Sequence, residues 1–174
     1  MPLILNRYET NYRLSLWKLT EPLEFLEEKS RLTQYDNNLY QQISNETRKR
    51  EWLAVRVMLY EVLGFWPQIT YMETGKPILN NHSRHLSISH SREMVGILLS
   101  TSPFAGVDIE NRNRNIEKVK NRFLSKAELE NIETMTVPDK DVLHWCAKEA
   151  IFKSINMPNI DFASRIFVEN ITSD

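Results

Sequence analysis

The chain has 174 residues, with 22 lysines and arginines against 23 aspartates and glutamates, so its net charge is close to zero. This balance argues against a protein that coats nucleic acid, which would be strongly basic. The single cysteine, Cys146, excludes an intramolecular disulfide. No apolar run approaches the roughly 20 residues of a membrane helix, and the first residues are too polar for a secretory signal. We therefore expect a cytoplasmic protein with no membrane or nucleic-acid partner.

The first half of the chain is expected to combine short strands with one long helix. Apolar side chains recur at helical spacing through Asn45–Leu63, and Gly64 follows as a stop signal, so this segment is the clearest helix. A strand at Arg13–Leu19 and one or two short helices in Glu21–Leu39 are expected before it. Two further strand candidates, Ile69–Met72 and Leu86–Ile88, lie on either side of a tight turn at Gly75–Pro77.

The second half is expected to follow a similar order. Met94–Leu99 and Ala105–Ile109 predict a hairpin across Ser102–Pro103, within residues 94–110. Ser125 with Glu128 fits a capping box at the start of a helix. Three helices and a last short strand are expected, at Ile116–Phe123, Ser125–Met135, Asp139–Ile155 and within Ile160–Val168.

The two long helices share a weak sequence similarity. EWLAVR begins at Glu51 and HWCAKE begins at His144, and both contain Trp-x-Ala. This similarity suggests two tandem α/β halves, residues 1–92 and 93–174. Chance similarity between two helices explains it equally well. Strands and helices in this order place the chain in the α+β class.

Three carboxylates are candidates for a cation site. The stretch GVDIE alternates, so a strand there would put Asp108 and Glu110 on one face. On the second long helix, Glu149 shares a stripe with Trp145 and Lys153, which a half-buried cleft would explain. Asp108, Glu110 and Glu149 together would suit Mg²⁺. The alternatives are a solvent-facing strand edge and an exposed helix face with one ion pair.

Several polar residues are of types that suit phosphate groups. His90 ends a short strand beside Ser89, and Lys76 lies in a tight turn that lacks the rest of a P-loop. Arg48 and Arg56 are eight residues apart, close to one face of the first long helix. A structural histidine, a surface turn and a solvated basic face are the ordinary explanations, and they stay open from the residues alone.

Taken in order, these motifs resemble the 4′-phosphopantetheinyl transferase superfamily, and within it the longer, monomeric type. The resemblance runs through REWLAVR, GKP, SISHS, GVDIE, RFLSKAE and WCAKEAIFK, and so covers roughly residues 48–153. It implies two similar α+β halves with the active site in the cleft between them. It also implies a Mg²⁺-dependent transfer of phosphopantetheine from coenzyme A to a serine of an acyl or peptidyl carrier protein, which releases 3′,5′-ADP.

The resemblance also implies roles for individual residues. Asp108, Glu110 and Glu149 match metal ligands, and Glu149 is the candidate base, directly or through a water. Asp108, Glu149 and Lys148 are the implied catalytic residues. Contacts with coenzyme A are implied for Arg48, Arg56, Lys76, Pro77, Ser89, His90, Lys148 and Lys153. Glu128 matches an acidic position near the metal, although its part in the capping box explains it equally well.

Two other functions use the same residues. A Mg²⁺-dependent nucleotide phosphohydrolase would need the three carboxylates but no carrier protein. A non-catalytic module would only hold coenzyme A or a carrier. For the transferase, the segment Asn111–Leu124 offers Arg112, Arg114, Ile116 and Phe123 to an acidic carrier. An ordinary solvated loop and helix is the competing explanation for this segment.

Overall fold

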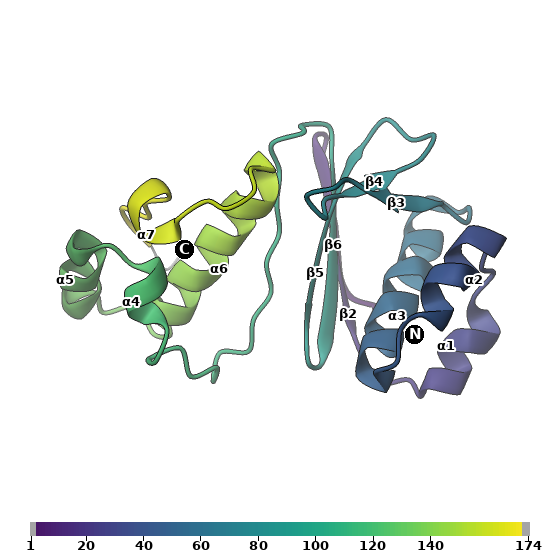
Figure 1. Cartoon of the computed structure of the whole chain (residues 1–174), viewed down its shortest axis with the longest axis horizontal. Coiled ribbons are helices and arrows are strands. Elements are labelled where there is room, and N and C mark those ends of the chain that lie inside the picture. The colour runs from purple at the N-terminus through teal and green to yellow at the C-terminus, as the bar shows by residue number, and fades with distance from the viewer. Residues whose placement is uncertain (1–2, 172–174) are drawn as a thin grey trace.

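The computed structural model describes residues 3–171, and in it a four-stranded antiparallel sheet separates two groups of helices (Figure 1). The strands lie in the order β1-β2-β6-β5, and their bounds are Leu3–Tyr8 for β1, Tyr12–Lys18 for β2, Met94–Ser100 for β6 and His85–Ser91 for β5. A separate two-stranded sheet pairs β3 (Ile69–Tyr71) with β4 (Pro77–Leu79). The strands predicted at Arg13–Leu19, Ile69–Met72 and Leu86–Ile88 are confirmed, whereas β1 lies outside every predicted element.

Helices α1 to α3 cover one face of the sheet and enclose the larger apolar core. Their bounds are Leu23–Lys29 for α1, Gln34–Gln41 for α2 and Glu46–Leu63 for α3. α3 starts where the Asn45 side chain accepts a hydrogen bond from the Arg48 N–H, and it ends at Gly64, whose φ of 77° suits glycine. α3 packs against β2 and β6 on one side and against α1 on the other, so its middle is buried all round.

Helices α4 to α7 lie on the opposite side of the sheet (Figure 1). Their bounds are Lys120–Phe123 for α4, Lys126–Thr134 for α5, Lys140–Ile155 for α6 and Phe162–Arg165 for α7. The predicted capping box of α5 is confirmed, because Ser125 and Glu128 each accept a hydrogen bond from the other's backbone N–H. This group encloses a smaller apolar cluster of Ile116, Phe123, Leu124, Ile132 and Val142.

Residues 105–110 run between β5 and α6 and connect the two parts of the molecule. The N–H groups of Val107 and Ile109 donate to the hydroxyls of Ser87 and Ser89 on β5, both at 3.1 Å. The alternation expected for a strand is therefore present, but serine side chains take the place of a backbone ladder.

Gly106 allows this segment to lie directly against α6. A Cβ built on Gly106 would lie 2.0 Å from the carbonyl oxygen of Ala150 and 3.1 Å from the backbone nitrogen of Ser154. Only glycine permits such an approach of two backbones.

The predicted hairpin over residues 94–110 is wrong. β6 pairs with β2 along one edge and with β5 along the other, so neither edge is left for residues 105–110. The strand predicted within Ile160–Val168 is also wrong, because this segment contains α7. The helix predicted at Ile116–Phe123 is limited to its last turn, which is α4. The turn Gly75–Pro77 connects β3 to β4 rather than to β5.

The mixed α+β class is confirmed by the sheet and the seven helices of residues 3–171. In these residues every strand lies within 3–100, and the predicted boundary at 92/93 falls between the paired strands β5 and β6. The division into tandem halves therefore remains a prediction. No helix of the described part of the chain has the length and apolar character needed to cross a membrane.

Candidate active site

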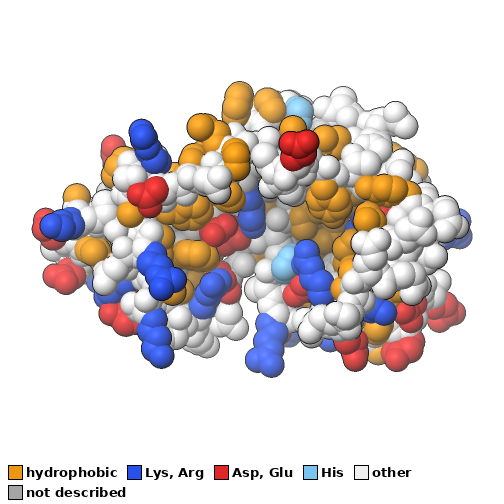
Figure 2. Space-filling view, viewed as in Figure 1, with side chains coloured by type: hydrophobic (Ala, Val, Ile, Leu, Met, Phe, Trp, Pro, Cys, Tyr) orange, Lys and Arg blue, Asp and Glu red, His pale blue; other side chains and the backbone are white. Residues whose placement is uncertain are grey.

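The candidate site is a cavity of about 290 Å³ between β5, residues 105–110 and α6. It is lined by Ile88, Ser89, His90, Asp108, Ile109, Glu110, Arg114, Trp145, Glu149 and Lys153. Six of these were predicted to bind metal or coenzyme A: Ser89, His90, Asp108, Glu110, Glu149 and Lys153. Figure 2 shows the hollow between the two groups of helices, with acidic and basic side chains around it.

Lys153, near the C-terminal end of α6, makes the central polar contacts. Its Nζ donates to Asp108 Oδ1 at 2.7 Å, to Ser89 Oγ at 3.1 Å and to the Val107 carbonyl at 3.2 Å. The Ser89 hydroxyl in turn donates to Asp108 Oδ1 at 2.8 Å. The charge of Asp108 is therefore balanced by an internal lysine, and β5 and α6 are linked across the cavity.

Glu149 lies one helical turn before Lys153 and lines the same cavity. Burial raises the pKa of Glu149, and the negative charge of Asp108 raises it further, whereas Lys153 and Arg114 oppose the rise. A carboxylate with a raised pKa accepts a proton more readily near neutral pH. Glu149 is therefore suited to act as a general base.

Arg114 is a site residue that the sequence analysis placed only in the docking segment. It forms an ion pair with Glu110, and its guanidinium lies 5.0 Å from the centre of the Trp145 ring. Glu110 also accepts a hydrogen bond from the Asn111 N–H at 2.9 Å. The spacing of four residues between Glu110 and Arg114 is a sequence signal that could have indicated this pair.

The three predicted metal ligands share a cavity but are not assembled as a metal site. Within residues 3–171, no group of three or more histidine, cysteine, aspartate or glutamate side chains lies close enough to hold a metal ion. Asp108 instead contacts Lys153, and Glu110 contacts Arg114. The donor chemistry nevertheless fits a hard divalent cation, because three carboxylates line one cavity and the Asp108 charge raises the pKa of Glu149.

His90 lies at the end of the cavity next to α3, between two charged residues. Its Nδ1 is 3.1 Å from Glu51 Oε2, and Arg48 Nη1 contacts its Nε2. Burial and the positive charge of Arg48 lower the pKa of His90, so the neutral ring donates to Glu51 and accepts from Arg48. The sequence analysis missed Glu51, a buried carboxylate whose position in the middle of a helix gave no sign of this contact.

Arg56 lies behind these residues in a smaller cavity of about 30 Å³, which Arg48 and His90 also line. Its side chain is buried against the Trp52 ring and bonded to Asp36, with Nε 3.0 Å from Oδ1. Its Nη2 also lies 3.0 Å from Asp36 Oδ1, as part of the ion pair. Arg56 is thus held by Asp36 at the edge of this cavity.

Lys76 and Pro77 line a third cavity, of about 190 Å³, between the β3–β4 turn and the end of α6. Lys76 Nζ donates to the Pro103 carbonyl at 2.9 Å and to the Ser154 carbonyl at 3.2 Å. Burial lowers the pKa of Lys76. Lys76 therefore joins the β3–β4 turn to α6.

The three cavities adjoin one another through shared residues. Ile88 lines all three, His90 lines the first and second, and Lys153 lines the first and third. Seven of the eight residues predicted to bind coenzyme A therefore lie along one continuous surface beside β5.

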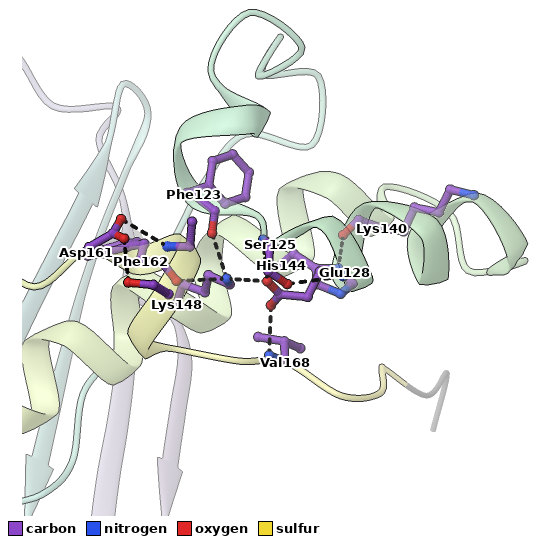
Figure 3. A network of polar contacts seen from close by, with 11 residues as sticks. Phe123, Ser125, Glu128, Lys140, His144, Lys148, Asp161, Phe162 and Val168 are labelled. Carbon is purple, nitrogen blue, oxygen red and sulfur yellow. Dashed lines mark hydrogen bonds and ion pairs between the residues drawn. The ribbon is translucent and has the colours of Figure 1, made fainter.

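Lys148 is the exception among the predicted site residues. It has no exposed surface and lines none of these cavities, and its Nζ contacts Glu128 and two backbone carbonyls (Figure 3). This position does not support the predicted contact with phosphate. Glu128 is likewise removed from the carboxylates, which favours its capping role over a role near a metal.

A family model and the curated relatives of this chain both indicate the same protein family. The model of the 4'-phosphopantetheinyl transferase superfamily matches residues 105–171. The chain is 31% identical over 127 residues to the 4'-phosphopantetheinyl transferase AcpT of Salmonella typhi, an alignment that covers 69% of this chain and 66% of the relative. It is 31% identical over 122 residues to AcpT of Escherichia coli K12, covering 66% of this chain and 62% of the relative. The matched part thus spans about two thirds of the length of these relatives.

Proposed function

This chain belongs to the 4′-phosphopantetheinyl transferase superfamily, and we propose that it transfers phosphopantetheine from coenzyme A to a serine of an acyl or peptidyl carrier protein. The observation that carries the proposal is the cavity in which Asp108, Glu110 and Glu149 lie with Lys153. Cavities on either side add the cationic side chains that a nucleotide with several phosphates needs.

The proposed reaction breaks the phosphoanhydride bond of coenzyme A and forms a phosphodiester bond to the carrier serine. The serine hydroxyl of the carrier gives its proton to Glu149, directly or through a water, and its oxygen bonds to the β-phosphorus of coenzyme A. The bond from that phosphorus to the bridging oxygen breaks, and 3′,5′-ADP leaves with the bond's electron pair. The place of Glu149 in the cavity with Asp108 and Lys153 supports its role as the base.

The carboxylates of Asp108, Glu110 and Glu149 would hold Mg²⁺ in the transferase. When bound, the ion would offset the negative charge of the pyrophosphate. Because Lys153 and Arg114 now contact two of these carboxylates, both cationic side chains must turn away from them. We propose that Lys153 then pairs with the phosphates of coenzyme A.

The remaining polar residues are proposed to bind the nucleotide end of coenzyme A. His90 offers a ring nitrogen at the first cavity, and Arg48 and Arg56 offer guanidinium groups at the smaller cavity that adjoins it. Ser89 holds Asp108 in place, and Lys76 with Pro77 shapes the cavity beyond.

The carrier protein is proposed to approach over residues 111–115. Arg112 is exposed and pairs with Asp139, its Nη2 2.6 Å from Oδ2, so an acidic carrier would compete with Asp139 for this arginine. Ile116 and Phe123 are excluded from this surface, because both are buried in the smaller apolar cluster. One chain lines the whole cavity, and we therefore propose that the protein acts as a monomer.

Mass spectrometry of an apo acyl carrier protein, incubated with this protein, coenzyme A and Mg²⁺, tests the proposal. We expect the carrier to gain the mass of phosphopantetheine, and EDTA to abolish the gain. Asp108→Asn should abolish it as well, while Glu61→Gln, a matched change at an exposed carboxylate of α3, should leave it unchanged. Cleavage of coenzyme A without any carrier would support a phosphohydrolase instead. Binding of coenzyme A with no change to either molecule would support a non-catalytic module.

A further inference from the structure

Lys148 uses all of its hydrogen-bonding capacity inside the protein. Its Nζ lies 2.6 Å from the Phe123 carbonyl, 2.7 Å from Glu128 Oε2 and 3.1 Å from the Phe162 carbonyl (Figure 3). An ammonium group has three protons, so each has an acceptor. With no exposed surface and no unused donor, Lys148 has nothing to offer a phosphate.

Glu128, its partner, accepts three hydrogen bonds inside the protein. Oε2 accepts from Lys148 and from the Ser125 N–H at 2.8 Å, and Oε1 accepts from the Val168 N–H at 3.0 Å. One buried ion pair therefore joins the end of α4, the start of α5, the middle of α6, the start of α7 and the segment that follows α7 (Figure 3).

Lys148 lies on a different face of α6 from the residues of the candidate active site. Trp145, Glu149 and Lys153 repeat every four residues, and this face lines the candidate active site. His144 and Lys148 repeat at the same interval one residue earlier, about 100° away around the helix. Neither has exposed surface, so this second face is entirely buried.

Apolar packing also holds α6. Val142 is buried in the apolar cluster around α4, α5 and α6, and Trp145 and Cys146 of α6 pack against that cluster with part of their surface exposed. Apolar contacts fix the rotation of a helix weakly, because they have no preferred direction. Hydrogen bonds are directional, so the three contacts of Lys148 restrict the rotation more sharply than apolar packing does.

We propose that Lys148 and Glu128 form a buried clamp that fixes the rotation of α6 and so directs Glu149 and Lys153 into the cavity. Lys148 is then a positioning residue, and its effect on catalysis rests on the proposed transferase function. The clamp itself concerns the fold and can be measured whether or not transfer occurs.

Four variants test the clamp: Lys148→Met, Glu128→Gln, their combination, and Lys148→Arg. Lys140→Met is the matched control, because Lys140 lies on α6 two turns earlier and its Nζ donates to only one carbonyl, that of Met135, at 2.8 Å. For each protein we would measure the melting temperature, the kcat of transfer well below melting, and hydrogen exchange of the α6 amides.

We expect Lys148→Met and Glu128→Gln to lower the melting temperature by about 10 °C and kcat by at least about tenfold. The double variant should be no more than about twofold worse than the worse single one, since both changes remove one interaction. Lys148→Arg should not restore kcat, because a larger buried head has no room. Exchange along α6 should accelerate in both single variants, and Lys140→Met should match the wild type.

Two results would overturn the clamp. If Lys148→Met lost transfer while Glu128→Gln kept it, and Lys148→Arg restored it, Lys148 would contact a phosphate. If the melting temperatures fell while kcat and α6 exchange stayed at wild-type values, the pair would stabilise the fold without positioning α6. A wild-type protein that transfers nothing would refute the proposed function instead, and hydrogen exchange would still decide the clamp.

Discussion

Two buried ion pairs in this protein differ in what they leave available. Arg56, paired with Asp36 beside the larger apolar core, lines a cavity with Arg48. Lys148, paired with Glu128, has an acceptor for every proton and lines none of the described cavities. Burial of a basic side chain therefore does not decide whether it can reach a ligand. Its place beside a cavity does.

Breaking the ion pair between Arg56 and Asp36 should have the largest effect on the free energy of unfolding. Asp36→Asn keeps the size of the side chain but removes the charge that balances Arg56, whose guanidinium is almost fully buried. An unbalanced buried charge typically costs about 3–5 kcal/mol, so we expect a loss in that range in urea unfolding. Glu9→Ala, which removes the exposed partner of Arg7, should cost less than about 1 kcal/mol. Similar losses for both variants would mean that Arg56 does not depend on Asp36.

A change that pushes residues 105–110 away from α6 should lower the free energy of unfolding somewhat less. Gly106→Ala would put a Cβ 2.0 Å from the Ala150 carbonyl, so residues 105–110 must move away from α6. We expect a loss of about 3 kcal/mol, the upper end for overpacking, together with a marked fall in transfer. Gly96→Ala is the matched control, because the atoms nearest to its Cβ would belong to the flexible Ile109 and Leu16 side chains and not to a backbone. An equal loss in both variants would contradict a special role for the contact with α6.

Local signals made α3 and α5 predictable, but pairing partners did not follow from sequence. The cap at Asn45 and the stop at Gly64 are short-range, and they fixed α3 to within a residue. The alternation in GVDIE was also informative, yet the expected hairpin failed because β5 and β2 already occupy both edges of β6. Strand pairing depends on competition between distant segments, which a local pattern does not record.

The candidate site was predicted well where its residues share one face. Asp108, Glu110, Glu149 and Lys153 follow from spacing along one segment and one helix, and they line one cavity. Lys148 could not be judged in this way, because it is adjacent to Glu149 and its direction depends on a partner twenty residues earlier. A motif thus identifies which residues matter without showing whether each contacts a ligand.

Low pH should weaken the ion pair between Lys148 and Glu128. Burial alone would raise the pKa of Glu128, but hydrogen bonds from Lys148, Ser125 and Val168 lower it below its ordinary value. The unfolded chain then binds the proton more tightly than the folded one, so the contribution of Glu128 is complete above its ordinary pKa and falls as pH drops through the folded pKa. Urea unfolding between about pH 6 and pH 3 should show a steeper decline for the wild type than for Glu128→Gln. Parallel curves would contradict a lowered pKa.

The smallest expected effect concerns proton uptake next to Arg56. Burial and the charge of Arg48 lower the pKa of His90 in the free protein. A phosphate group of coenzyme A beside His90 would raise that pKa, because a nearby negative charge favours the protonated ring. Binding should therefore take up a fraction of a proton between the free and bound pKa values, and affinity should weaken as pH rises through that interval. Calorimetry in buffers of different ionisation enthalpy measures this uptake, and His90→Gln should reduce it to the part that coenzyme A itself contributes. If proton uptake in His90→Gln equalled that of the wild type, another group would be the one that titrates. The proposed contact between His90 and the nucleotide would then be contradicted.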